Sequence, residues 1–352
     1  MNINFISQTP QEKEITSATN LFVFNPEHDF ALAVGKGSYT PPAEIVNVRK
    51  KYSLLPASYA DNGDFIFISD SLSASDLKSS PFFKEITKKN IKIVDKDSLP
   101  VYSGIITKVI PWGWDFAIFN NLTEAGLEPK LLPSAEQLLE IRNLSHRRTT
   151  IPFLQTLSNL LNLQEFQFPV EIANIEMLDS YLSADQPFYL KAPWSSSGRG
   201  IILSDHITLQ GLLEWSHGII RRQGSILLEK AWNKKIDFAT EWWITEGEPI
   251  FLGVSVFKTS SRGKYHGNII ASQEELFKLI SKEAPGFNED LVEAQKYSLR
   301  HHIGTRYSGP VGIDMLTDDK GNINPCVELN MRLTMGMIPL IQNRGFLFNF
   351  GV

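Results

Sequence analysis

Short apolar runs alternate with helix-like segments along the N-terminal third of the chain. The apolar runs cover residues 20–26, 64–70, 91–95 and 104–115. Helix-like segments cover residues 76–90 and 114–126. Strands that alternate with helices predict a parallel sheet with helices on both faces.

The pattern changes near residue 145, where strand-like runs begin to follow one another. These runs cover residues 186–193, 200–204, 225–232, 239–245 and 249–259. Short turns such as TEGEP, residues 245–249, join neighbours and predict a largely antiparallel arrangement. A helix broken at Pro285-Gly286 and a hairpin over 311–330 follow. The expected fold class is therefore α/β, with an α+β second half.

Composition narrows the class of protein. The chain has 352 residues, 42% of them apolar and 21% charged, with a formal net charge of −5. This length suits two or three domains, and the charge argues against nucleic acid as the main partner. No apolar stretch approaches the ~20 residues of a membrane span, and the first residues show no signal pattern. Cys326 is the single cysteine, which excludes a disulfide framework and favours a cytoplasmic location.

The hairpin over 311–330 carries the clearest chemistry. Asp314 stands among apolar residues in VGIDML, where an ordinary strand seldom has an acid. Glu328 and Asn330 are two residues apart and point to one face, and Arg332 continues the row. Val327 and Leu329 are expected to point into a core. The alternative is a solvated face of an edge strand.

The turn of this hairpin decides whether the acids can meet. A three-residue loop over 319–321 pairs Asp314 with Cys326 and places both on the face of Glu328. Asp314 and Glu328 are then diagonal neighbours, and Pro325 faces outward or lies at a bulge. Two carboxylates and an amide oxygen are ligands that Mg²⁺ prefers, with nucleotide phosphates completing the shell.

A second candidate is the loop FYLKAPWSSSGRGI, residues 188–201. Lys191 ends a strand and precedes three serines and two glycines, whereas the common phosphate loop has its lysine after the glycines. Backbone N–H groups in such a loop can wrap an anion, and Lys191 can reach phosphate oxygens. The alternative is a plain hairpin tip.

Two further stretches are weaker signals. Glu229 to Trp232 end a buried-type strand, where a base can dock on backbone groups while Asp237 meets a ribose. Arg262, Lys264 and His266 lie in a Ser/Gly loop that can close over an anion as a lid. The alternative for the first stretch is an ordinary strand end, and the alternative for the second is a solvated run of charges.

These four stretches, in this order, resemble the ATP-grasp superfamily, which includes D-alanine–D-alanine ligase, biotin carboxylase and glutathione synthetase. The resemblance covers residues 140–340 or so, and GID…VELNMR is its most specific part. It implies an N-terminal parallel α/β domain, a small central lid domain and a C-terminal mixed-sheet domain. We expect these domains at 1–133, 134–232 and 233–352. Most members activate a carboxylate as an acyl-phosphate and join it to an amine, releasing ADP and phosphate.

The resemblance also implies roles for individual residues. Metal ligands are Asp314, Glu328 and Asn330, and groups that act on the phosphates or the intermediate are Lys191, Lys264 and Arg332. Residues expected to bind the nucleotide are Arg147 or its neighbour Arg148, Lys191, Ser195, Ser196, Ser197, Gly198, Gly200, Glu229, Lys230, Ala231, Trp232 and Asp237. An arginine at position 147 departs from the lysine of many members. The implied cofactors are ATP and Mg²⁺, for which Mn²⁺ can substitute.

Loops after the N-terminal strands are candidates for the acceptor substrate, because ligands sit beyond the carboxyl ends of parallel strands. These candidates are Asn25, Glu27, His28, Asp29, Tyr39, Trp112, Trp114 and Asp115. The alternative is turn chemistry at Asn-Pro and Trp-Gly.

Three functions remain open from the sequence. The first is an ATP-dependent ligase that joins a small-molecule carboxylate to an amine. The others are an ATP-grasp kinase and a nucleotide-binding regulatory protein without turnover, and the full metal set argues against the last. No GxSxG or GxGxxG motif supports a serine hydrolase or a dinucleotide-dependent dehydrogenase. A homodimer is left open.

Overall fold

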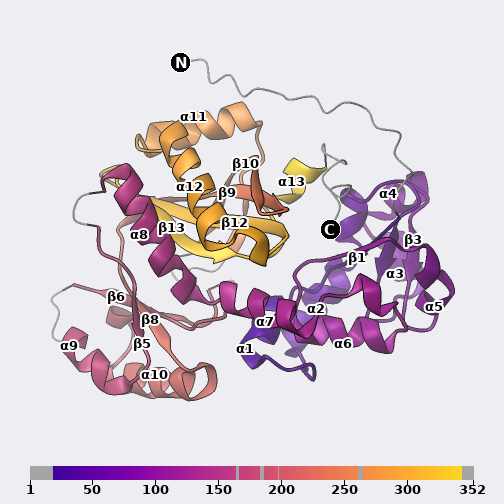
Figure 1. Ribbon diagram of the computed structural model, residues 1–352, viewed down its shortest axis with the longest axis horizontal. Helices are drawn as coiled ribbons and strands as arrows, with labels where there is room; N and C mark the ends of the chain where they lie inside the picture. The colour runs from indigo at the N-terminus through magenta and orange to yellow at the C-terminus, as the bar shows by residue number, and fades with distance from the viewer. Residues whose placement is uncertain (1–18, 164–165, 183–185, 197, 261–264, 343–352) are drawn as a thin grey trace.

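Three β-sheets, each with its own helices, form the part of the chain that the structure describes (Figure 1). The computed structural model describes residues 19–163, 166–182, 186–196, 198–260 and 265–342. In Figure 1 the first sheet lies at the right, the second at the lower left, and the third between and above them.

The first sheet has four parallel strands in the order β3-β2-β1-β4. Its strands are β1 (Asn20–Val23), β2 (Phe65–Phe67), β3 (Lys92–Val94) and β4 (Lys108–Pro111). Its helices are α1 (His28–Val34), α2 (Ala43–Tyr52), α3 (Ala74–Ser79), α4 (Phe83–Lys88), α5 (Leu99–Tyr102) and α6 (Phe116–Glu124). The predicted parallel sheet is confirmed, and β1 and β2 are buried throughout, as expected for strands covered on both faces.

The second sheet is antiparallel, in the order β5-β8-β6-β7. Its strands are β5 (Val170–Ile172), β6 (Phe188–Lys191), β7 (Ile201–Leu203) and β8 (Ile226–Lys230), and its helices are α9 (Asp179–Leu182) and α10 (Leu209–Gln223). A separate apolar cluster beneath it includes Leu190, Leu212 and Ile226. This sheet therefore has a core of its own.

The third sheet has the order β11-β10-β9-β12-β13. Its strands are β9 (Lys234–Thr245), β10 (Glu248–Thr259), β11 (Tyr265–Asn268), β12 (Gly309–Asp318) and β13 (Ile323–Asn330). Every pairing among its described residues is antiparallel, so the expectation of a mixed sheet is wrong. Tight turns join β9 to β10 and β12 to β13, and such turns reverse the chain.

Four helices accompany the third sheet, and one more precedes them. They are α7 (Ala135–Leu144), α8 (Thr150–Leu161), α11 (Gln273–Glu283), α12 (Glu289–His302) and α13 (Ile338–Ile341). α8 packs mainly on α12 and β13. The domain boundaries at 133/134 and 232/233 stay predictions, but the packing of α8 joins it to the C-terminal sheet.

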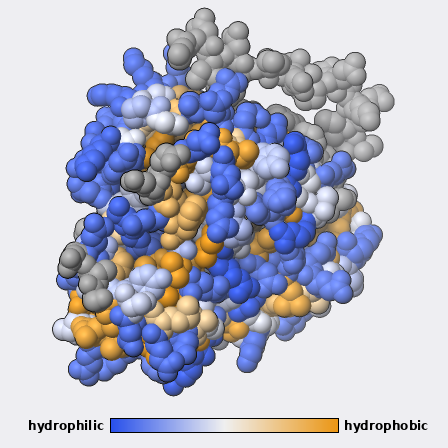
Figure 2. Space-filling view, turned by 60° about the vertical axis from the view of Figure 1, so that its left-hand side comes forward, coloured by the Kyte–Doolittle hydropathy of each residue, from blue (hydrophilic) through white to orange (hydrophobic). Residues whose placement is uncertain are grey.

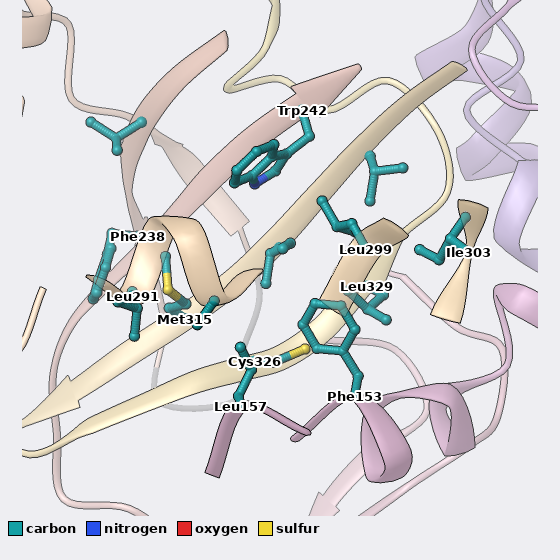
Figure 3. Packing of buried hydrophobic residues seen from close by; sticks show 14 of the residues in the cluster. Phe153, Leu157, Phe238, Trp242, Leu291, Leu299, Ile303, Met315, Cys326 and Leu329 are labelled. Carbon is teal, nitrogen blue, oxygen red and sulfur yellow. The ribbon is translucent and has the colours of Figure 1, made fainter. Parts of the chain in front are cut away.

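One face of the third sheet packs against helices in a large apolar core (Figure 3). Phe238, Trp242 and Met315 of the sheet meet Phe153 of α8 and Leu299 of α12 there. Because side chains alternate along a strand, the residues between these core positions project from the opposite face. That opposite face carries the candidate site.

The surface is mainly polar. Figure 2 shows a face covered mostly by hydrophilic residues, with apolar residues in smaller groups between them. Within the described ranges, no helix combines the length and apolarity needed to cross a membrane.

Candidate active site

Two rows of side chains cross the open face of the third sheet. In the first row, Ala239 of β9 is paired with Asp314 of β12, which is paired with Glu328 of β13. In the next row, Gly312 lies between Glu241 of β9 and Asn330 of β13. Directly paired residues share a face, so both acids of the first row and both polar groups of the second project the same way.

The predicted register of the hairpin is wrong, and a bulge explains why. Asp314 pairs with Glu328 and not with Cys326, because the register shifts between Asp314 and Leu316. Cys326 consequently joins the apolar core, and Val327 lines the site instead of the core. The bulge also places Glu328 directly opposite Asp314, closer than a diagonal neighbour.

Asp314 lies in a concentration of negative charge. Burial, and then the carboxylates of Glu328 and Glu241, raise the pKa of Asp314 to about 8, against the opposing effects of Asn330 and Arg332. A nearby cation stabilises the ionised form of such a carboxyl group. Among the described residues no cluster of three His, Cys, Asp or Glu could hold a metal alone. Two carboxylates and the Asn330 amide fit Mg²⁺, which usually keeps phosphate and water ligands as well.

Arg147 connects the second sheet to this cluster. It lies in a short 3₁₀ turn (Arg147–Thr149) before α8 and is buried. Nη1 donates to Ala192 O at 2.5 Å and to Ser195 Oγ at 2.7 Å, and Nη2 donates to Glu328 Oε1 at 2.7 Å. Its Nε is buried and has no hydrogen-bond partner among the described residues. Of the two arginines left open by the sequence, the structure brings Arg147 to the site and leaves Arg148 half exposed.

Lys191 ends β6 at the wall of the site. Its ammonium is paired with Glu229 of β8, and both side chains are largely buried. In the loop that follows, Gly198 and Gly200 have φ of 72° and 80°, which glycine adopts without strain. A Cβ at Gly200 would lie 2.9 Å from Ser195 Cβ, so this turn also needs glycine for space.

Arg332 connects the third sheet to the first. Its Nε donates to Asp29 of α1 at 3.0 Å, and Nη2 donates to Asn330 Oδ1 at 2.8 Å. Beside it, Leu333 N donates to Trp112 O at 2.8 Å. The Asp29–Arg332 ion pair and this backbone bond fix the N-terminal loops against the metal-type cluster.

A cavity of about 780 Å³ lies where the three sheets meet. That volume suits a nucleotide with a small second ligand. Its lining includes Asp29, Trp112, Arg147, Lys191, Ser196, Gly198, Trp232, Asp237, Glu241, Asp314, Glu328, Asn330 and Arg332.

Comparison with known proteins gives a match in sequence and many matches in structure. No model of a known protein family matches the sequence. The chain is 27% identical over 214 residues to the butirosin acyl-carrier protein–L-glutamate ligase of Niallia circulans. The match covers 59% of this chain and 48% of that protein, so it spans about half of the relative's length.

Two solved structures overlay almost the whole chain. N5-carboxyaminoimidazole synthetase from Staphylococcus aureus, complexed with ADP, has a TM-score of 0.54 at 10% identity over 97% of this chain and 80% of that one. Biotin carboxylase from Campylobacter jejuni, in an ATP-type complex, has a TM-score of 0.55 at 11% identity over 96% and 72%. Biotin carboxylase belongs to the superfamily that the sequence resembles. The chain has the ATP-grasp fold.

Within this ATP-grasp fold, most predicted site residues meet at the cavity, but some do not. The predicted residues absent from its lining are Ser195, Gly200, Glu229, Lys230 and Ala231. Ala231 N donates to Pro187 O at 3.1 Å. Trp232 and Asp237 line it, and Asp237 accepts from Lys234 at 2.7 Å and Thr259 at 2.6 Å. Ser197 and Lys264 lie outside the described residues.

Among the N-terminal candidates, Asp29 and Trp112 line the cavity, whereas His28, Trp114 and Asp115 do not. Asp115 is the N-cap of α6, accepting from Ala117 N at 2.8 Å. His28 Nδ1 lies 3.2 Å from Asp115 Oδ2, and both residues are 1% exposed. Their geometry fits a structural role at the start of α6.

Glu241 is one of the cavity residues that the sequence analysis missed. It lies in ATEWWIT, an acid surrounded by strand-forming residues. The same signal identified Asp314 in VGIDML, so it was available for Glu241 as well.

Proposed function

We propose that this protein is an ATP- and Mg²⁺-dependent ligase that activates a carboxylate as an acyl-phosphate and joins it to an amine or similar nucleophile. The support is the convergence of the three sheets on one cavity. The second sheet and the turn before α8 supply cations, the third sheet supplies paired acids, and the first sheet supplies an apolar wall. The L-glutamate ligase relative agrees with this proposal.

The chain's cations match the charges of the reaction. A carboxylate oxygen attacks the γ-phosphorus, and the bond to the ADP oxygen breaks. The nucleophile then attacks the carbonyl carbon of the acyl-phosphate, expels phosphate and loses its proton. These steps bring anions together, so they depend on positioning and on charge neutralisation. Arg147, Lys191 and Arg332 supply three positive charges along the cavity wall.

Asp314, Glu328 and Asn330 would hold Mg²⁺ in this proposal. The ion would neutralise phosphate charge when bound. The pairing of Asp314 with Glu328 and the raised pKa of Asp314 support this assignment.

The test is ADP release with mass detection of products, using the L-amino acids and small organic acids with ammonia and amines as nucleophiles. L-Glutamate is the first acid to try, because the relative is named for it. Asp314→Asn serves as the control for contaminating ATPases. A product with the mass of a condensation supports the ligase, a phosphorylated product selects the kinase, and the absence of any ATP-dependent product overturns both.

A cytoplasmic location and small-molecule substrates belong to the same proposal. The single cysteine requires no oxidising compartment.

A further inference from the structure

Glu241 is a buried carboxylate in the cavity wall with few partners. Ser255 Oγ donates to its Oε1 at 2.9 Å, and Thr334 Oγ1 lies 3.0 Å from both oxygens. The residue is 1% exposed. No described lysine, arginine or histidine lies within ion-pair distance of it, although Arg332 is near enough to act through its field.

Two hydroxyl donors do not compensate a buried carboxylate. A carboxylate can accept about four hydrogen bonds, and a buried charge is ordinarily paired with an opposite charge. Every other acid in the described cavity lining has a cation or a proposed metal: Asp29 has Arg332, Asp237 has Lys234, and Asp314 and Glu328 form the metal-type pair. Glu241 alone lacks one among the described residues.

Two glycines let the backbone pass close to this carboxylate and to its two hydroxyl partners. A Cβ at Gly336 would lie 2.3 Å from Ser255 Oγ and 2.4 Å from Glu241 Oε1, and a Cβ at Gly312 would lie 2.7 Å from Thr334 Cγ2 and 3.1 Å from Glu241 Oε2. Gly336 also lines the cavity. Glu241 and Asn330 lie on either side of Gly312 in the same row, two strands or about 10 Å apart.

We propose that Glu241, with Ser255 and Thr334, binds the protonated amino group of an amino acid whose carboxylate is activated. An ammonium supplies the missing charge and up to three donors to the free lone pairs of Glu241. In an α-amino acid, the ammonium and the carboxylate are attached to one carbon. A substrate held at Glu241 therefore places its carboxylate beside the Asp314–Glu328 row, where the γ-phosphate is expected.

This inference rests on the proposed ligase and names its substrate class. Hydroxylamine, a small neutral nucleophile, separates the two ideas because it traps an acyl-phosphate as a hydroxamate. The assay compares each L-amino acid with the acid that lacks its amino group, such as L-glutamate with glutarate and L-alanine with propionate. The wild type, Glu241→Gln and the exposed control Glu248→Gln, on the same β9–β10 hairpin, are measured side by side.

The wild type should prefer the amino acid of at least one pair. Glu241→Gln should lower kcat/KM for that amino acid by roughly 30- to 1,000-fold, because it removes the charge that pairs with the ammonium. The preference, meaning the ratio of kcat/KM for the amino acid to kcat/KM for its matched acid, should fall by at least tenfold relative to the wild type, and Glu248→Gln should keep the wild-type preference.

The possible failures are distinct. If the wild type yields neither hydroxamate nor ADP with any acid, the proposed ligase fails. If it yields hydroxamates but Glu241→Gln slows both members of a pair equally, or neither, the ligase stands and the ammonium site is rejected. Loss of amine joining alone, with hydroxamate formation intact, also rejects the assignment to the activated substrate.

Discussion

At the scale of single residues, burial raises the pKa of two acids on the open face of the third sheet, Glu241 and Asp314. Burial raises the pKa of Glu241 to about 7, against hydrogen bonds from Ser255 and Thr334 and the field of Arg332. Asp314 is raised further, to about 8, partly by Glu241 itself. Both groups are less favourable as anions in the ligand-free protein than in an unfolded chain.

The raised pKa of Glu241 predicts that this residue lowers the free energy of unfolding by an amount that depends on pH. A raised carboxyl pKa means that the folded state binds more protons, so stability falls as pH rises from about 4.5 to about 7 and levels off above that. Glu241→Gln should therefore stabilise the ligand-free protein at pH 8.5 by on the order of 1–3 kcal/mol, and by much less at pH 5. Chemical denaturation at the two pH values checks this. An equal effect at both would mean that Glu241 titrates near its ordinary range.

A second prediction concerns Glu328. Glu328→Gln should lower turnover at least ~100-fold while the protein stays folded, because it removes one of two paired charges proposed to hold the cation. The measurement is ADP release over a Mg²⁺ titration, with circular dichroism for the fold and the exposed Glu248→Gln as control. A normal rate at limiting Mg²⁺ would remove Glu328 from the metal set.

The sequence indicated some of these residues and not others for a physical reason. An acid within an apolar strand is visible in one dimension, which identified Asp314 and would have identified Glu241. The partner of an acid is not visible in this way. Whether Arg147 or Arg148 reaches Glu328 depends on the turn before α8, which spacing alone does not define.

At the scale of elements, the β12–β13 bulge positions Glu328. The turn prediction was sound at the hairpin tip, where Gly321 has φ of 82°. It failed beyond Pro325, because the pairing steps from Leu316–Asn324 to Asp314–Glu328 across the bulge. Proline cannot donate to a ladder, so the sequence indicated where regular pairing would break, but not by how much.

Arg147 connects the loop after β6 with β13 through Ser195 and Glu328. Arg147→Lys should weaken binding of a non-hydrolysable ATP analogue by roughly 10- to 100-fold. The planar guanidinium contacts Ser195 and Glu328 at the same time, whereas a lysine ammonium is a single point charge. Isothermal titration checks this, with the half-exposed neighbour Arg148→Lys as the matched control. Equal affinities for the two variants would show that the connection between the sheets does not prepare the nucleotide site.

At the scale of the whole molecule, the first sheet meets the third through a shared apolar cluster and through the Asp29–Arg332 pair. The cluster brings Phe22 and Ile66 of the first sheet together with Trp243 and Leu252 of the third. Asp29 and Arg332 are 303 positions apart in the chain. No local pattern encodes such a contact, which is why the sequence named both residues without pairing them.

Asp29→Asn should therefore reduce product formation, while affinity for the ATP analogue stays within a few-fold. The variant keeps the size of the side chain and removes the charge that orients Arg332, which the proposal places at the acyl-phosphate. In a double-mutant cycle with Arg332→Lys, the two changes should couple by about 1–3 kcal/mol in kcat/KM. Additive effects would indicate that the pair only holds the sheets together.

The N-terminal side of the cavity is built differently from the rest. Phe24, Pro26, Val48, Tyr52 and Trp112 form its apolar wall, whereas the proposed ATP-handling groups come from the other two sheets and the turn before α8. Selection can thus alter the shape of this wall without touching phosphoryl chemistry. A combinatorial library restricted to these five codons would sample new acceptors in a background that still transfers the γ-phosphoryl group of ATP. Paralogues that diverged in substrate would be expected to differ first at these positions.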